Sequence, residues 1–351
     1  MHTTQKFHLI LGGAILGMAL IACSCGSILP MLTATVTPAA APLPTNPPAP
    51  TLPPPPANQQ SDLAGYWQIG EVVFTIESQA GKPAVTAINM AGTSTRILEN
   101  QSWDGASLSW TYTYTDENGS STVTYKTVSV NGDFLRVEYS TSGGGSRVRL
   151  LRKVNSRTPD YYSLPWSEDF SNPESGWDIY STTDDQAGYR DGAYFVISKT
   201  NKFSSFGSSN RFFGNTVMDV DATPVSGPAA NDYSYHIGCR VQSNADGYIF
   251  EVEADGYYAA GYYKGGGNDY VSLLTGDDWQ PSSAIKQGLQ ANHLTVTCSG
   301  NQLKLAINGQ VVYSGQDSTF TEGDIDLGAA TYDKNNQPAE IHFTNLEVKL
   351  P

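Results

Sequence analysis

The stretch SYHIGCRVQSNADGYIFEVEADGYYAAGYYK, residues 234–264, decides the fold. It contains three runs, 234–242, 248–254 and 257–264, which are rich in Tyr, Val, Ile and Phe and are separated by short segments of Asn, Asp and Gly. In the first two runs every second residue is apolar, which is the period of a half-buried β-strand. The stretch therefore predicts three successive β-strands joined by short turns.

Runs of the same kind continue on both sides of this stretch, and no segment after Ser61 has the periodicity of an amphipathic helix. The sequence therefore predicts an all-β protein. In the first part of the folded chain the expected strands are 65–78, 84–90, 94–100, 107–115, 121–130, 133–140 and 146–154. In the second part they are 192–198, 216–222, 234–242, 248–254, 257–264, 270–274, 293–299, 302–307, 310–314, 325–331 and 339–350.

The run count and the turns divide the folded region into two expected domains. Residues 62–158 hold seven or eight runs, which suits a small antiparallel barrel; Asn-Gly pairs at 118–119 and 131–132 lie between runs, where a tight turn needs positive φ. Pro159 and its polar neighbours mark the boundary. The 11 strands expected in residues 159–351 suit a two-sheet sandwich or jelly roll.

The expected barrel opens with Gly65-Tyr66-Trp67, and its last strand carries Arg149 and Arg152. These features resemble the G-x-W start and the closing Arg of calycin barrels. The resemblance covers residues 62–154. It implies that Arg149 or Arg152 lies across Trp67 and plugs one end of the barrel, and it implies no ligand.

Short phrases in the second domain occur in a characteristic order. They are DFS at 169–171, SGW at 175–177, YRDG at 189–192, GCR at 238–240, DGY at 246–248, LTVTC at 294–298 and ING at 307–309. This order resembles the laminin G-like branch of the concanavalin A-like lectin/glucanase superfamily. The phrases are turns and core anchors, so the resemblance implies a jelly-roll fold and leaves the activity open.

The charge is unevenly distributed along the chain. Residues 159–351 carry 25 acidic against ten basic side chains, whereas residues 62–158 carry nine of each. A nucleic-acid partner needs a basic patch that neutralises phosphates, and the sequence contains none. The composition therefore argues against nucleic-acid binding.

The N-terminal segment is typical of an export signal. Lys6 precedes an apolar run of 14 residues, 9–22, which is shorter than the roughly 20 residues that span a bilayer. The tetrad Leu-Ile-Ala-Cys at 20–23 resembles the lipobox of bacterial lipoproteins, and the resemblance implies cleavage after residue 22 and acylation of Cys23. An ordinary secretory signal with an incidental Cys is the alternative.

Residues 23–61 are expected to form a disordered tether. Eleven of the 20 prolines lie between residues 30 and 56, and no charged residue occurs between Phe7 and Ser61. Such a segment cannot bury a core and favours extended polyproline II. Signal and tether together predict an extracytoplasmic protein anchored to the cell membrane by a lipid.

Cys239 and Cys298 lie on two predicted strands and are the only cysteines outside the signal region. Because the protein is expected outside the cytoplasm, a disulfide is the natural interpretation. Two buried thiols are the alternative, since no Cys or His at suitable spacing favours a metal site.

No catalytic motif is evident. The three histidines of the folded region are each alone on a strand, and neither a G-x-S-x-G elbow nor a phosphate-binding loop occurs. A glycosidase needs only two carboxylates, and alternation places Glu251 and Glu253 on one strand face. However, this run does not match the E-x-D-x-x-E type of the superfamily's glucanases, so we assign no catalytic residue and keep a glycoside-processing enzyme as the alternative.

An open polar sheet face is the candidate binding site. Alternation directs polar side chains outward from three strands, and they meet if these strands share one sheet. Carboxylates and Arg bond to sugar hydroxyls, and Tyr257 or Tyr263 and a loop Trp can stack on the sugar ring. The predicted glycan-binding residues are Asp219, Asp221, His236, Arg240, Glu251, Glu253 and Trp279.

The sequence favours a lipid-anchored surface protein whose jelly roll binds a glycan or another extracellular polymer. An enzyme on the same face, or an adhesion module with a protein partner, remains open. No cofactor or metal site is assigned. The acidic loops at 277–278 and 333–336 leave a structural Ca²⁺ open, because Ca²⁺ takes six to eight oxygen ligands.

Overall fold

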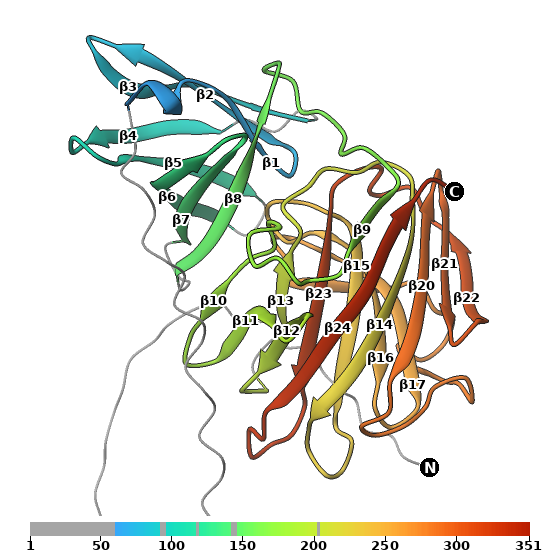
Figure 1. Ribbon diagram of the computed structural model, residues 1–351. Helices are drawn as coiled ribbons and strands as arrows, with labels where there is room; N and C mark the ends of the chain where they lie inside the picture. Colours follow the sequence, from blue (N-terminus) through green and yellow to red (C-terminus); the bar gives the residue numbers. More distant parts are fainter. Residues whose placement is uncertain (1–59, 92–95, 117–118, 142–145, 202–203) are drawn as a thin grey trace, which may run out of the picture.

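The computed structural model describes residues 60–91, 96–116, 119–141, 146–201 and 204–351. Apart from one short 3-10 helix (Gln60–Leu63), its regular elements are β-strands in three antiparallel sheets (Figure 1). The all-β prediction, a small barrel-like sheet followed by a two-sheet jelly roll, is confirmed. No helix in the described part of the chain is long and apolar enough to span a membrane.

Sheet A is a meander of eight strands in the order β3-β2-β1-β8-β7-β6-β5-β4. Its first strand thus lies beside its last, and β3 and β4 are the edges. The side chain of Gln101 on β4 bonds to both the N–H and the C=O of Val85 on β3, at 2.8 and 3.3 Å, so the two edges are linked and the barrel nearly closes. The strands are β1 (Gly65–Ile69), β2 (Val72–Gln79), β3 (Lys82–Met90), β4 (Ile97–Trp103), β5 (Leu108–Asp116), β6 (Gly119–Asn131), β7 (Phe134–Thr141) and β8 (Ser146–Val154).

Aromatic rings fill the interior of sheet A. Trp110 stacks on Tyr125 with ring centroids 5.2 Å apart, and Phe74 meets both edge-on. The prediction that Arg149 or Arg152 lies across Trp67 is wrong. In the register of β1 against β8, Lys153 lies opposite Trp67 and its ammonium sits 5.4 Å from the indole centre. Arg149 is drawn instead to Asp178, outside the sheet.

The second region is a sandwich of sheets B and C. Sheet B has the order β10-β11-β12-β24-β14-β20-β21-β22 with β9 beside β24, and sheet C has the order β13-β23-β15-β16-β17-β18 with β19 beside β17. Sheet B comprises β9 (Trp166–Glu168), β10 (Tyr180–Ser181), β11 (Asp185–Arg190), β12 (Ala193–Ser198), β14 (Thr216–Ser226), β20 (Asn292–Ser299), β21 (Gln302–Ile307), β22 (Gln310–Gln316) and β24 (Ala339–Lys349). Sheet C comprises β13 (Ser205–Ser208), β15 (Tyr233–Val241), β16 (Gly247–Glu253), β17 (Tyr257–Lys264), β18 (Asp269–Ser272), β19 (Gln280–Pro281) and β23 (Asp324–Thr331).

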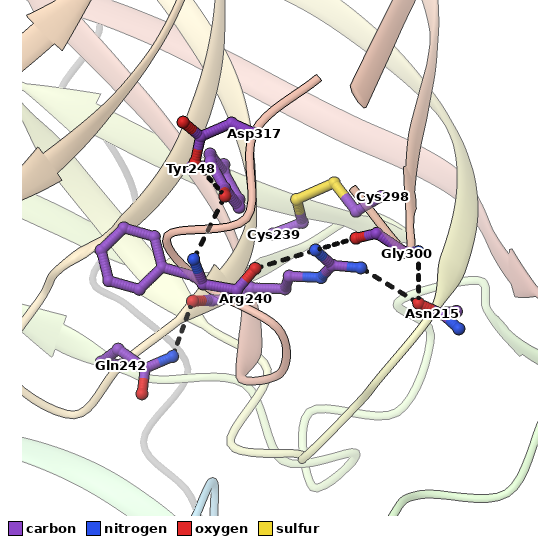
Figure 2. The surroundings of a disulfide bond; sticks show 9 residues. Asn215, Cys239, Arg240, Gln242, Tyr248, Cys298, Gly300 and Asp317 are labelled. Atoms are coloured by element: carbon purple, nitrogen blue, oxygen red, sulfur yellow. Dashed lines mark hydrogen bonds between the residues drawn. A yellow bond between two sulfur atoms is a disulfide. The ribbon is translucent and has the colours of Figure 1, made fainter. Parts of the chain in front are cut away.

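The predicted inward side chains form the core between sheets B and C. Met218 and Val220 of β14 face Ile237 of β15 and Phe250 of β16, and all four are fully buried. Cys239 on β15 and Cys298 on β20 form the predicted disulfide, which joins the two sheets through the core (Figure 2). Each sheet therefore has one face in the core and one outer face.

Sheet A packs against one end of the sandwich (Figure 1). Val148 of β8 forms an isolated bridge with Ile179, and the adjacent Asp178 makes ion pairs with Arg147 and Arg149. A second contact joins the turn after β1 to the turn after β15, where Glu71 accepts a hydrogen bond from the Ser243 N–H at 2.8 Å. The domain boundaries at 61–62 and 158–159 stay a prediction.

Candidate functional site

The structure divides the predicted binding residues between two outer faces. Asp219 and Asp221 lie on β14, a strand of sheet B, whereas His236, Glu251 and Glu253 lie on β15 and β16 of sheet C. The prediction that all of them share one open face is wrong. Alternation identified the outward residues of each strand but could not show which strands are neighbours.

On the outer face of sheet B, the two aspartates surround His293. The His293 Nδ1 lies 2.7 Å from an Asp221 carboxylate oxygen, and Asp219 pairs with Lys349 at 2.7 Å. Thr295 also donates to Asp219. His293, Asp221 and Lys349 are well exposed, so this cluster is a solvated group of polar contacts that includes the ion pair Asp219–Lys349.

Arg240 has a structural role. The structure buries it to 2% exposure, so the expected outward position on an open face is wrong. The register of β15 against β23 shifts between Cys239 and Val241, and this bulge breaks the alternation on which the prediction relied. The guanidinium donates to the Gly300 and Phe320 carbonyls and to Asn215, beside the disulfide (Figure 2).

On the outer face of sheet C, His236 and Glu251 are direct cross-strand partners, and Ser234 lies opposite Glu253. These side chains converge as the alternation of β15 and β16 predicts. They are buried rather than open, however, since each is at most 1% exposed. The neighbouring positions of this face hold Asp326 on β23 and Tyr263 on β17.

Glu251 is the centre of a hydroxyl network. Its Oε1 accepts hydrogen bonds from Ser234 at 2.5 Å and from Tyr332 at 2.8 Å. Burial, and after it the negative charge of Glu251, raises the pKa of the Tyr332 hydroxyl well above its ordinary value. The same two causes act on Tyr263, so both hydroxyls keep their protons at neutral pH.

His236 and Asp326 form a second pair on this face, with the His236 Nε2 3.7 Å from Asp326 Oδ1. His236 lies over Gly328 and Asp326 over Gly238, where any Cβ would collide with them. Burial lowers the pKa of His236 to about 4, and burial together with the nearby Asp324 raises the pKa of Asp326 to about 8. At neutral pH the pair is therefore largely uncharged, although Asp326 is close to titration.

Each member of this pair has a buried polar atom without a hydrogen-bond partner in the structure, the Nδ1 of His236 and the Oδ1 of Asp326. The side chains of His236 and Asp326 are 2% and 10% exposed. A buried polar group without a hydrogen bond costs about 1–3 kcal/mol, and such groups also occur in the cores of the described residues, at Trp110 and Trp177.

Aromatic side chains border the network. Trp279, in the segment between β18 and β19, is half-buried and meets Tyr332 edge-on with ring centroids 6.3 Å apart. Tyr270 on β18 lies over Gly261 and beside Tyr263. Trp279 thus lies beside the residue that donates to Glu251, and its role in binding stays a prediction.

The sequence prediction missed Ser234, Asp326, Tyr332 and Tyr270. The segment DIDLGAA at 324–330 carries a usable signal, because Ile325, Leu327 and Ala329 point into the core and the residues between them must face outward. Tyr332 follows the end of β23, and outside a strand alternation does not predict the direction of a side chain.

In the described residues, no group of three or more His, Cys, Asp or Glu side chains could hold a metal ion. The Asp333 carboxylate accepts the N–H groups of Asn335 and Gln337 and thereby closes its own turn, while Asp277 and Asp278 are exposed. Cys23 lies outside the described residues.

The fold defines the class of protein, a two-sheet jelly-roll sandwich preceded by a barrel-like sheet. No protein-family model matches the sequence, and no curated protein compared with it matches either.

Three similar solved structures differ in how much of each chain the similarity covers. The carbohydrate-binding module CBM66 from Bacillus subtilis is 17% identical, with a TM-score of 0.34, over 54% of this chain and 99% of that one. A Bacillus licheniformis β-glucanase is 12% identical, with a TM-score of 0.39, over 53% and 98%. A sialidase is 12% identical, with a TM-score of 0.42, over 82% of this chain and 32% of that one.

Proposed function

We propose that this protein binds a glycan, or another hydroxyl-rich extracellular polymer, at the outer face of sheet C. The observation that carries the proposal is the convergence of a carboxylate network, a buried imidazole–carboxyl pair and a bordering indole on one sheet face. These belong to Glu251, to His236 and Asp326, and to Trp279.

The chemistry of this face suits sugar hydroxyls. Carboxylate oxygens have several lone pairs and accept from hydroxyl pairs, and neutral His236 has one acceptor and one donor nitrogen. A protonated Asp326 can also donate. Tyr332 and Trp279 offer apolar ring surface for the C–H face of a pyranose.

A glycan array probed with the full chain tests the proposal. We expect at least one glycan to be bound, and Trp279→Ala to weaken that binding. Val311→Ala, an exposed apolar residue on β22 of the other sheet, is the matched control and should bind like the wild type. If no glycan or polysaccharide is bound, the proposal fails.

Glycoside processing on the same face is the second candidate, and Asp326 is the observation that favours it. A glycosidase needs one carboxyl that keeps its proton and one that is ionised. With a pKa of about 8, Asp326 keeps its proton at neutral pH, on the face that holds Glu251 and Glu253. The test is whether the wild type releases shortened products from the bound glycan. If Glu251→Gln still binds the glycan but releases no products, glycoside processing is established.

We also propose that Cys23 carries the lipid that anchors the protein outside the cytoplasm. The tetrad at 20–23, the uncharged Pro-rich segment behind it and the disulfide Cys239–Cys298 support this location. Mass spectrometry of the N-terminal peptide from membranes should find Cys23 acylated and first in the chain. An unmodified Cys23, or cleavage at another residue, would contradict the anchor.

A further inference from the structure

Asn-Gly pairs are a chemically reactive feature of the hairpin turns, and the binding face does not use them. They occur at 118–119, 131–132 and 308–309. Asn118 lies outside the described residues, and the other two pairs stand at hairpin tips, between β6 and β7 and between β21 and β22. We infer that Asn131 is a site of spontaneous deamidation in the folded protein, whereas Asn308 is protected from this reaction.

An Asn that precedes Gly is reactive because Gly has no Cβ to shield its own backbone nitrogen. That nitrogen attacks the side-chain carbonyl carbon of the Asn, and the new C–N bond closes a five-membered succinimide ring. The side-chain nitrogen leaves as ammonia together with the proton of the backbone N–H. Water then opens the ring at either carbonyl and gives Asp or isoAsp, so water is the one co-reactant.

The surroundings of Asn131 are open. Asn131 is the last residue of β6, and Gly132 and Asp133 form the two-residue loop before Phe134. All four residues are exposed. Gly132 has a φ of 58°, and a Cβ at this position would meet no atom within 4 Å. The first residue of a two-residue hairpin loop does not donate to the ladder, so the Gly132 nitrogen is available for the attack.

Asn308 has the opposite surroundings, although Gly309 is equally open. The Asn308 amide nitrogen donates to the Ala284 carbonyl and to the side-chain oxygen of Asn292, both at 2.7 Å. Its oxygen accepts from the His293 N–H at 3.0 Å. Ring closure would break these hydrogen bonds, and loss of the amide nitrogen would leave two acceptors without their donor.

Deamidation of Asn131 has a predictable effect on sheet A. IsoAsp adds a carbon atom to the main chain directly before the turn that sets the register of β6 against β7. Asn131 pairs with Phe134, and the next residue of β7, Leu135, is fully buried in the interior of sheet A. We therefore expect the isoAsp form to unfold more readily than the unmodified protein.

Peptide mapping by mass spectrometry of the full chain, aged at mildly alkaline pH, measures both sites at once. The exchange of –NH2 for –OH changes the peptide mass, and fragmentation distinguishes isoAsp from Asp. We expect Asn131 to convert at least about tenfold faster than Asn308, because Asn308 must first give up its hydrogen bonds. In the chain unfolded by urea, the two sites should convert at similar rates, because both precede Gly.

Asn131→Gln is the matched variant, since its longer side chain would have to close a six-membered ring. It should stay unmodified at this position, and the aged variant should keep the stability of the fresh one. Two results would overturn the inference. One is an Asn131 that stays intact in the aged folded protein, and the other is an Asn308 that converts there as fast as Asn131.

Discussion

Asp326 and His236 are neighbours whose pKa values are shifted in opposite directions. The pKa of the Asp326 carboxyl is raised to about 8 by burial and by Asp324, whose own pKa is raised to about 7 by burial. Burial also lowers the pKa of His236 to about 4. Tyr263 of β17 lies on the same face, and burial raises the pKa of its hydroxyl, which stays protonated at neutral pH. Burial disfavours the charged form of each group, so it raises the pKa of the Asp carboxyl and lowers the pKa of the His imidazole. Both members of the pair therefore favour their uncharged forms.

These shifts predict that the free energy of unfolding falls as pH rises toward about 8 and levels off above it. Folded Asp326 holds its proton up to about pH 8, whereas the unfolded chain loses it near pH 3.8. The folded state thus binds more protons, and the free energy of unfolding falls as pH rises, by at most about 1.4 kcal/mol per pH unit for one group. His236 acts in the opposite sense, but only between about pH 4 and 6.5, so the window from pH 6.5 to 8.5 isolates the carboxyls.

Urea denaturation of the wild type and of Asp326→Asn across this window measures the effect. We expect a smaller decline in the variant, with a remainder from Asp324. A decline of equal slope in both proteins would show that Asp326 is not protonated in the fold.

A buried carboxylate reinforces the backbone bridge between β8 and the segment before β10. Asp178, which precedes β10, is fully buried between Arg147 and Arg149 of β8 and also accepts from Asn210. Asp178→Asn leaves two guanidinium groups without their counter-ion, and we expect it to destabilise the protein by about 3 kcal/mol. Chemical denaturation followed by circular dichroism measures this loss.

The exposed pair Glu77–Arg157 is the matched control for Asp178. Both of its side chains are about half exposed, so Glu77→Gln should cost less than about 1 kcal/mol. Equal losses in the two variants would mean that sheet A is not fixed to the sandwich through Asp178.

The long strands could be predicted from the sequence, but which strands lie side by side in a sheet could not. Alternation in 234–242 and 248–254 predicted both the strands and their inward residues, because the side chains that face the core between the sheets are apolar and most of those on the other face are polar. It could not place β14 in the other sheet, since its neighbours β20 and β24 are far away in sequence. Short strands such as β13 contain too few residues for a period, and the bulge at Arg240 reverses the pattern locally.

At the scale of the whole molecule, the sandwich presents two outer faces with different chemistry. The face of sheet B carries solvated polar contacts around His293, and that of sheet C carries the buried network of Glu251 with the pair His236–Asp326. Sheet A contacts one end of the sandwich, at Ile179 and at Ser243. The central claim is that binding belongs to the face of sheet C.

Isothermal titration calorimetry with the best glycan of the array tests this claim most directly, on the wild type and on one variant of each face. Glu251→Gln should weaken binding at least roughly tenfold, about 1.4 kcal/mol, because the buried Glu251 holds the hydroxyl of Tyr332, whose ring lies against Trp279. Asp219→Asn, an equal loss of charge on sheet B, should leave the Kd unchanged. A Kd that is raised by Asp219→Asn and unaffected by Glu251→Gln would contradict the account.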